Sequence, residues 1–180
     1  MNAADEQHVF APKRHLPRLD PAAYRGMKHV NFTATTQRRQ RLFVKRAIVD
    51  FCVELLQTQC AGHACECLVY CFMPDHVHMI LHGLDEASDA RQCHNDWKGA
   101  TGKYLAQHCS GTRHWQAQSY DHVLRAIEYE RGALRKMIGY ILENPVRAGL
   151  VTTWQEYPFV GSLIGPCDIR HPYWWEWFYE

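Results

Sequence analysis

The sequence contains no long apolar run, and none of its hydrophobic stretches reaches the roughly 20 residues that a membrane-spanning helix requires. The first six residues have none of the apolar character of a secretory signal peptide. Internal repeats and low-complexity segments are also absent. We therefore expect a cytoplasmic protein without a membrane partner. Its 180 residues suit one domain with a full hydrophobic core.

None of the eight cysteines belongs to a Cys-x-x-Cys pair. Cys52 and Cys71 lie within otherwise apolar segments, as buried thiols do. This pattern predicts reduced, partly buried cysteines and no disulfide framework. A zinc site is an alternative, although its spacings match no tetrahedral template well. Its four candidate ligands are Cys60, His63, Cys65 and Cys67.

The chain has almost no net charge, because 20 Lys and Arg face 19 Asp and Glu. The distribution is uneven: residues 1–49 hold ten basic and three acidic side chains, a charge of +7, which leaves −6 for the remainder. A basic N-terminal stretch could follow a phosphate backbone. A solvated, flexible segment explains the same charge equally well.

Hydrophobic periodicity predicts an alternation of strands and helices along the chain. Strands are expected at 29–35, 65–73, 76–82 and, as a short one, 114–119; helices are expected at 42–59, 96–108 and 126–143. The strands at 65–73 and 76–82 form a hairpin around the turn at Pro74-Asp75, and residues 83–96 form a loop leading into a helix. This order predicts an α+β fold: a single-domain ferredoxin-like sandwich with helices packed on an antiparallel sheet.

The segment His76-Val77-His78 falls in a predicted strand, so both imidazoles project from the same face and Val77 from the other. Two histidines within reach of one cation form a partial metal site, because a metal needs further ligands. The alternative is a pair of surface histidines on a half-buried strand, which is a frequent chance pattern in a chain with 12 histidines.

Tyr140 and Asn144 are four residues apart in a predicted helix and therefore share a helix face. Taken alone, Tyr140 is explained by packing at the edge of the core. Asn144 is explained as the residue that ends the helix before Pro145, since proline disfavours helical geometry at the preceding residue.

Taken together and in this order, these segments closely resemble the single-tyrosine transposases of the His-hydrophobic-His nuclease superfamily, and in particular the REP-associated tyrosine transposases. The resemblance covers residues 28–163 and is carried by the segments 29–33, 73–78, 97–98, 115–116, 120–123, 140–151, 154 and 157–159. One departure lies near its end. The family often has Tyr-Pro-x-Ser-Ser there, whereas this chain has Tyr157-Pro158-Phe159-Val160-Gly161-Ser162, which leaves any role of that loop in doubt.

The resemblance implies that His76 and His78 are metal ligands, that Asn144 is the third protein ligand and that Tyr140 is the nucleophile. It implies a single-stranded DNA substrate, often beside a hairpin, with the tyrosine left on the 5′-phosphate. Imidazole and amide ligands add no negative charge; Mg²⁺ prefers oxygen and Mn²⁺ tolerates imidazole better, so Mg²⁺ or Mn²⁺ is expected as the cofactor. A tyrosine nucleophile also suits rejoining, because the phosphotyrosine linkage keeps the energy of the phosphodiester.

Contacts to DNA are predicted from basic and aromatic side chains. Five basic residues cluster at the start of the first predicted helix: Arg38, Arg39, Arg41, Lys45 and Arg46. They could bind phosphates without reading sequence. Trp115 and Tyr120 could stack on unpaired bases, and ordinary packing in or around the core explains them at least as well.

We expect an extended basic arm over residues 1–26, a catalytic transposase domain over 27–163 and an aromatic C-terminal tail over 164–180 that packs on the domain, in a monomer or a homodimer. Two other functions remain open. A catalytically silent nucleic-acid-binding module of the same fold predicts a broken catalytic set. A metal-dependent hydrolase with a water nucleophile predicts carboxylate ligands, and Asp75 is the only carboxylate adjacent to the histidine pair.

Overall fold

The structure, a computed structural model, describes residues 19–111 and 114–164. Most of the predicted basic arm and nearly all of the predicted aromatic tail lie outside these residues, and so does the predicted packing of that tail. The last part of the arm is described and is not extended. Residues Pro21–Tyr24 form a 3-10 turn in which Tyr24 is fully buried.

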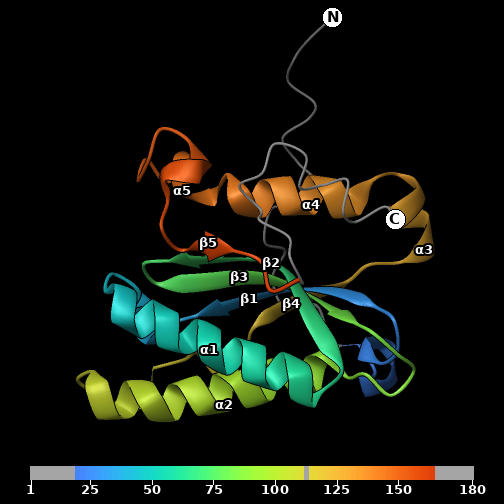
Figure 1. Cartoon of the computed structure of the whole chain (residues 1–180), viewed down its shortest axis with the longest axis horizontal. Helices are drawn as coiled ribbons and strands as arrows, with labels where there is room; N and C mark the ends of the chain where they lie inside the picture. The colour runs from blue at the N-terminus through green and yellow to red at the C-terminus, as the bar shows by residue number, and fades with distance from the viewer. Residues whose placement is uncertain (1–18, 112–113, 165–180) are drawn as a thin grey trace, which may run out of the picture.

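Five strands form one antiparallel sheet in the order β4-β1-β3-β2-β5 (Figure 1). They are β1 (His29–Thr35), β2 (Cys65–Met73), β3 (His76–Gly83), β4 (Tyr120–Val123) and β5 (Val160–Gly161). The β2–β3 hairpin and the α+β fold class are confirmed. Along β3 the predicted alternation also holds, because Val77, Met79 and Leu81 are fully buried on one face while His76 and His78 belong to the other.

Two helices cover the face of the sheet that receives Val77 and Met79 (Figure 1). They are α1 (Arg46–Gly62) and α2 (Ala90–His108). Helix α1 begins four residues later than predicted. Phe43, which fits the helical pattern, instead fills the core from the preceding loop, where its N–H binds the carbonyl of Pro74 at 3.1 Å. Helix α2 begins six residues earlier than predicted, because the Asp89 carboxylate caps it by accepting a hydrogen bond from the Gln92 N–H at 2.9 Å.

The opposite face carries α4 (Ala133–Leu142), preceded by α3 (Ala126–Glu130) and followed by α5 (Asn144–Arg147) (Figure 1). Met137, Ile138 and Ile141 of α4 pack on this face. The single helix predicted over 126–143 is therefore wrong. Gly132, whose φ of +67° is in the left-handed region, separates α3 from α4. Residue 144 was predicted to end the helix. Instead, α4 ends just before it and a new short helix, α5, begins at Asn144 with proline in its first turn.

The short strand predicted over 114–119 is also wrong, since the fourth strand of the sheet begins at Tyr120. In the predicted segment Trp115 makes only an isolated bridge to Thr36, just beyond the end of β1. The aromatic and apolar character of the segment reflects burial of a loop against the core.

All seven described cysteines are free thiols, and all but Cys109 are buried. The predicted reduced state agrees with this arrangement. Among the described residues no group of three or more His, Cys, Asp or Glu side chains could hold a metal ion, which contradicts the alternative zinc site. His63, one of its four candidate ligands, instead pairs with Asp96 at 2.9 Å. In the same part of the chain, no helix is both long and apolar enough to cross a membrane.

Candidate metal centre and tyrosine

The structure brings His76, His78 and Tyr140 together on the face of the sheet covered by α4. The rings of His76 and His78 lie 4.8 Å apart between centroids. The ring of Tyr140, in the last turns of α4, lies 6.4 Å from the ring of His78 and nearly perpendicular to it. Residues more than 60 positions apart in sequence therefore form one polar group.

Each histidine is held by a hydrogen bond at Nδ1. His76 Nδ1 lies 2.6 Å from Asp75 Oδ1, and His78 Nδ1 lies 2.9 Å from Thr33 Oγ1. These contacts fix the two ring orientations and leave Nε2 of each imidazole to face a ligand. A hydrogen-bonded Nδ1 with a free Nε2 is the usual arrangement of a metal-binding histidine.

The local electrostatics keep His78 neutral. Burial, followed by the neighbouring His76 and Arg147, lowers the pKa of His78 to about 3. Burial alone would raise the pKa of Asp75, but the hydrogen bonds and charges of His76 and Arg39 outweigh it and lower this pKa below its ordinary value. The site thus combines a neutral imidazole with an ionised carboxylate that holds the second imidazole.

Arg147 in α5 ties the tyrosine to Asn144. Its Nη2 donates to the carbonyl oxygen of Tyr140 at 2.7 Å and to Asn144 Oδ1 at 2.8 Å. Its guanidinium carbon also lies 4.0 Å from the centre of the Tyr140 ring, within the range of a cation–π interaction. Tyr140 remains 37% exposed, so its ring is accessible at the surface.

The donor set fits a divalent cation of intermediate hardness. His76 and His78 would each offer Nε2, and Asn144 would offer Oδ1. The Nδ1 atoms of both imidazoles are engaged by Asp75 and Thr33, whereas Asn144 Oδ1 accepts a hydrogen bond from Arg147 and Asn144 Nδ2 donates to the carbonyl of Ile141. Within the described residues, Asn144 is held beside Tyr140 rather than against either histidine.

The predicted basic residues lie at the end of the sheet where β3 begins. The segment between β1 and α1 is fastened to the turn before His76 by two backbone bonds, from Thr36 N to Asp75 O and from Phe43 N to Pro74 O. Four exposed basic side chains lie in this segment and a fifth, Arg46, begins α1: Arg38, Arg39, Arg41, Lys45 and Arg46. Arg39 pairs with Asp75 at 3.2 Å and Arg46 with Asp50 at 3.8 Å. The segment therefore presents a positive surface beside the histidine pair.

The two predicted aromatic contacts differ in exposure. Trp115 is only 7% exposed, packs against Phe43 and Trp97, and donates from Nε1 to Thr101 Oγ1. Tyr120 is 48% exposed and pairs with Thr33, which in turn pairs with His78, so these three residues form a row across β4, β1 and β3. Tyr120 is therefore a second tyrosine on the face that carries the site.

Sequence reasoning missed the roles of Thr33, Asp75 and Arg147. Arg147 had a detectable signal, because it lies three residues after Asn144 and seven after Tyr140, a spacing that brings side chains to one helical face. Thr33 had none, since its contact with His78 depends on the register of β1 against β3. Asp75 was weighed only as a catalytic base or ligand, whereas it orients His76.

The site thus consists of a His-x-His pair on one strand of an antiparallel sheet and a tyrosine on the helix packed over that strand. Residues 26–144 match the family of IS200-like transposases, and the chain belongs to that family. The expected membership among transposases is thereby confirmed.

One of two similar solved structures supports the fold. A REP-associated tyrosine transposase bound to a REP hairpin superposes with a TM-score of 0.60 at 20% identity, over 84% of this chain and 82% of that one. A structure described as a transposase of Deinococcus radiodurans R1 gives a TM-score of 0.45 at 16% identity, over 73% of this chain and 97% of that one. Comparison with curated proteins finds no match.

Proposed function

We propose that this protein cleaves and rejoins single-stranded DNA, with Tyr140 as the nucleophile and Mg²⁺ or Mn²⁺ held by His76, His78 and Asn144. The observation that carries the proposal is the position of Tyr140, whose ring lies 6.4 Å from that of His78. Tyr140 and the histidine pair belong to the same chain in this arrangement, which supports attack by the tyrosine within one copy of the protein.

In the proposed reaction the Tyr140 oxygen attacks the phosphorus of a phosphodiester and the bond to the 3′-oxygen breaks. The phenolic proton leaves to solvent, the departing oxygen becomes a 3′-hydroxyl, and the 5′-phosphate stays on the tyrosine. Attack by a 3′-hydroxyl reverses these events and reseals the strand without ATP. A bound cation would supply positive charge for a non-bridging phosphate oxygen and help the tyrosine to ionise.

The residues of the chain itself support three parts of this reaction. Asp75 and Thr33 orient the two imidazoles. Arg147 holds the backbone and ring of the tyrosine, and its contact with Asn144 keeps that side chain next to it. The exposed basic segment beside the site would bind the phosphate backbone of the substrate.

We further propose that the substrate carries a hairpin near the cleavage position and that the chain falls in the REP-associated branch. Support comes from the similarly folded protein that was solved bound to a REP hairpin. It also comes from the order of the segments from His76 to Asn144, which resembles that branch.

The test is incubation of the full-length protein with 3′-end-labelled single-stranded DNA from the flanks of its own gene, with Mn²⁺, followed by a denaturing gel. We expect a labelled band that migrates with the protein and disappears in excess EDTA. A silent binding module would retain the DNA without cleaving it. A hydrolase with a water nucleophile would release shortened DNA and no adduct.

A further inference from the structure

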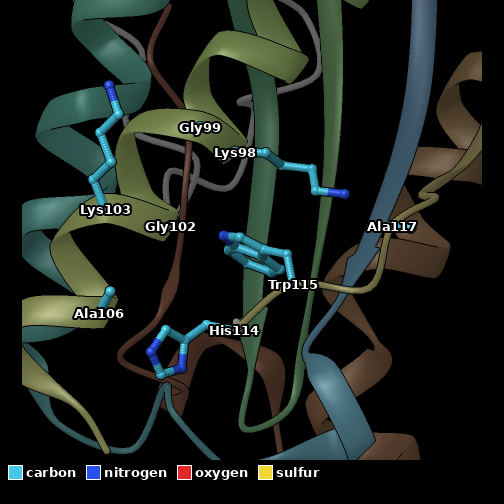
Figure 2. A pocket seen from close by; sticks show the side chains of 8 residues that line it. All are labelled: Lys98, Gly99, Gly102, Lys103, Ala106, His114, Trp115 and Ala117. Atoms are coloured by element: carbon cyan, nitrogen blue, oxygen red, sulfur yellow. The ribbon is translucent and has the colours of Figure 1, made fainter. Parts of the chain in front are cut away.

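A hollow on the opposite side of the sheet from α4 lies between helix α2 and the segment 114–117 (Figure 2). Its volume is about 510 Å³, within the range of small-ligand sites. Figure 2 shows the Trp115 ring at its centre, with His114 and Lys98 on either side and Lys103 and Ala106 along α2. The hollow therefore combines an apolar surface at Trp115 with the positive charges of Lys98 and Lys103, a combination that suits a flat group bearing negative charge.

Two glycines of α2 keep this hollow open. A Cβ at Gly99 would meet no atom within 4 Å, and one at Gly102 would meet Trp115 Cδ1 at 3.6 Å. Neither glycine has a φ that demands glycine, so the helix geometry does not require them. Their effect is to leave space beside the Trp115 ring.

His114 supplies an unused polar group at the same place. It is only 2% exposed, and its Nε2 lies 3.1 Å from the carbonyl of Gly111. Its Nδ1 is buried and has no hydrogen-bond partner among the described residues. A buried polar atom without a partner is unfavourable, so the His114 side of the hollow is not optimised for stability of the free protein.

The wall of the hollow continues to the end of the sheet that carries the histidine pair. The His114 carbonyl accepts from Gln37 N, and Gln116 N donates to the carbonyl of Thr35, which pairs with His76. Lys98 fastens the same wall to α2 through hydrogen bonds to Gln116 O and Ser119 Oγ. The hollow therefore adjoins the end of the sheet at which His76 lies, on the face opposite the histidine pair.

We propose that the hollow binds one unpaired nucleotide of the DNA strand, at a distance from the cleaved phosphate. The base lies against the Trp115 ring in the space beside Gly99 and Gly102, and Lys103 binds a neighbouring phosphate. This inference rests on the proposed function, because it assumes a single-stranded substrate. A paired base cannot enter the hollow without leaving its stack, so the site selects unpaired DNA.

The first test fills the hollow. Gly99→Leu places a larger side chain in it without a backbone clash, and Gly62→Leu is the matched control at another exposed helical glycine, on α1, with open space around its Cβ. Binding of fluorescent single-stranded DNA is measured by anisotropy. We expect Gly99→Leu to weaken affinity about tenfold, the size of effect that the loss of one base–aromatic contact has, and Gly62→Leu to leave it unchanged. Thermal melting verifies that both variants fold.

The second test removes the charge. Lys103→Gln is compared with Lys28→Gln, an exposed lysine just before the start of β1, at the opposite end of that strand from Thr35. We expect only Lys103→Gln to weaken binding and to reduce its salt dependence. An oligonucleotide containing 5-iodouracil should photo-cross-link to His114 or Trp115 in the wild type, and Gly99→Leu should abolish that cross-link.

The outcomes separate this inference from the proposed function, because adduct formation at Mn²⁺ is assayed on the same preparations. If the wild type forms the adduct and Gly99→Leu binds DNA normally, the proposed nucleotide site in the hollow is contradicted and the proposed function is not. Loss of affinity in Gly99→Leu without any wild-type adduct would support the hollow and overturn the proposed chemistry. An equal loss of affinity for duplex DNA would contradict the claim that the site takes an unpaired base.

Discussion

His76 and His78 owe their orientation to neighbours outside their own strand segment. Thr33 reaches His78 from β1, and Asp75 reaches His76 from the turn while also binding Arg39. Outer contacts of this kind fix which nitrogen of each ring is available and tune the affinity of a site for its metal. The strength of metal binding should therefore depend on Thr33 as well as on the histidines.

Mn²⁺ binding measured by titration calorimetry tests this dependence. His76→Ala and His78→Ala should abolish binding, and Asn144→Ala should weaken it less, since water can replace an amide oxygen. Thr33→Val keeps the shape of the side chain but removes the hydrogen bond to His78, and should lower affinity about 10- to 100-fold. His108→Ala, at an exposed residue on α2, is the control. Unchanged binding in the His78 variant would contradict the assignment.

Arg147 should act on the rate of adduct formation rather than on DNA affinity. Its hydrogen bonds to Tyr140 and Asn144 are charge-assisted, and losing such bonds costs about 1.5 to 3 kcal/mol. Arg147→Met should therefore slow adduct formation about 10- to 100-fold at saturating DNA, with partial rescue in Arg147→Lys, which keeps one donor. Arg131→Met is the control. A change in DNA affinity alone would show that Arg147 is a phosphate contact.

Helix α4 carries the tyrosine, and its start depends on backbone geometry at Gly132. This residue adopts a φ of +67°, whereas Gly139, inside the helix, would place a Cβ in open space. The two glycines of the same segment therefore respond oppositely to the same substitution. Gly132→Ala strains the backbone, while Gly139→Ala favours the helix by reducing the freedom of the unfolded chain.

Urea unfolding measures this difference. We expect Gly132→Ala to lose about 1 to 2 kcal/mol of unfolding free energy and Gly139→Ala to gain about 0.5 to 1 kcal/mol. The two substitutions are predicted to change the unfolding free energy in opposite directions, so each variant serves as the control for the other. Equal effects of the two substitutions would mean that α3 and α4 form one continuous helix in solution.

Three of the five strands were predictable from their apolar patterns: β1 and β2 have the predicted bounds, and β3 extends one residue beyond its own. The strand predicted over 114–119 was wrong, and the two-residue β5 was not predicted. The helix boundaries were not predictable. The start of α1 depends on Phe43, a loop residue that fills the core, and the start of α2 depends on the cap at Asp89. The histidine pair could be derived from its spacing, and Tyr140 became identifiable only when combined with it. Contacts set by strand register, such as Thr33 with His78, could not be read from the sequence.

The charge of the molecule is nearly balanced, yet its basic segment gathers beside the candidate site. Arg39 and Arg46 are paired with carboxylates, which leaves Arg38, Arg41 and Lys45 as the strongest candidates for phosphate contacts. A function on DNA therefore depends on where the charges lie and not on the net value.

Replacing Arg38, Arg41 and Lys45 together by Gln should weaken single-stranded DNA binding. If all three contact phosphates, the slope of log affinity against log salt should become shallower by about 2. The control replaces Lys28, Arg125 and Arg131, exposed residues that lie in sequence outside the segment. Anisotropy titrations over a range of salt give both slopes, and identical slopes would place the DNA path elsewhere on the molecule.

The central claim is that Tyr140 becomes covalently attached to a 5′-phosphate, and Tyr120 is the competing tyrosine on the same face of the sheet. The decisive measurement is mass spectrometry of the adduct formed with DNA labelled at either its 3′ or its 5′ end. We predict that only the 3′ label travels with the protein, that the modified peptide contains Tyr140, and that Tyr140→Phe forms no adduct while Tyr120→Phe does. An adduct on Tyr120, or an adduct that persists in Tyr140→Phe, would contradict the account.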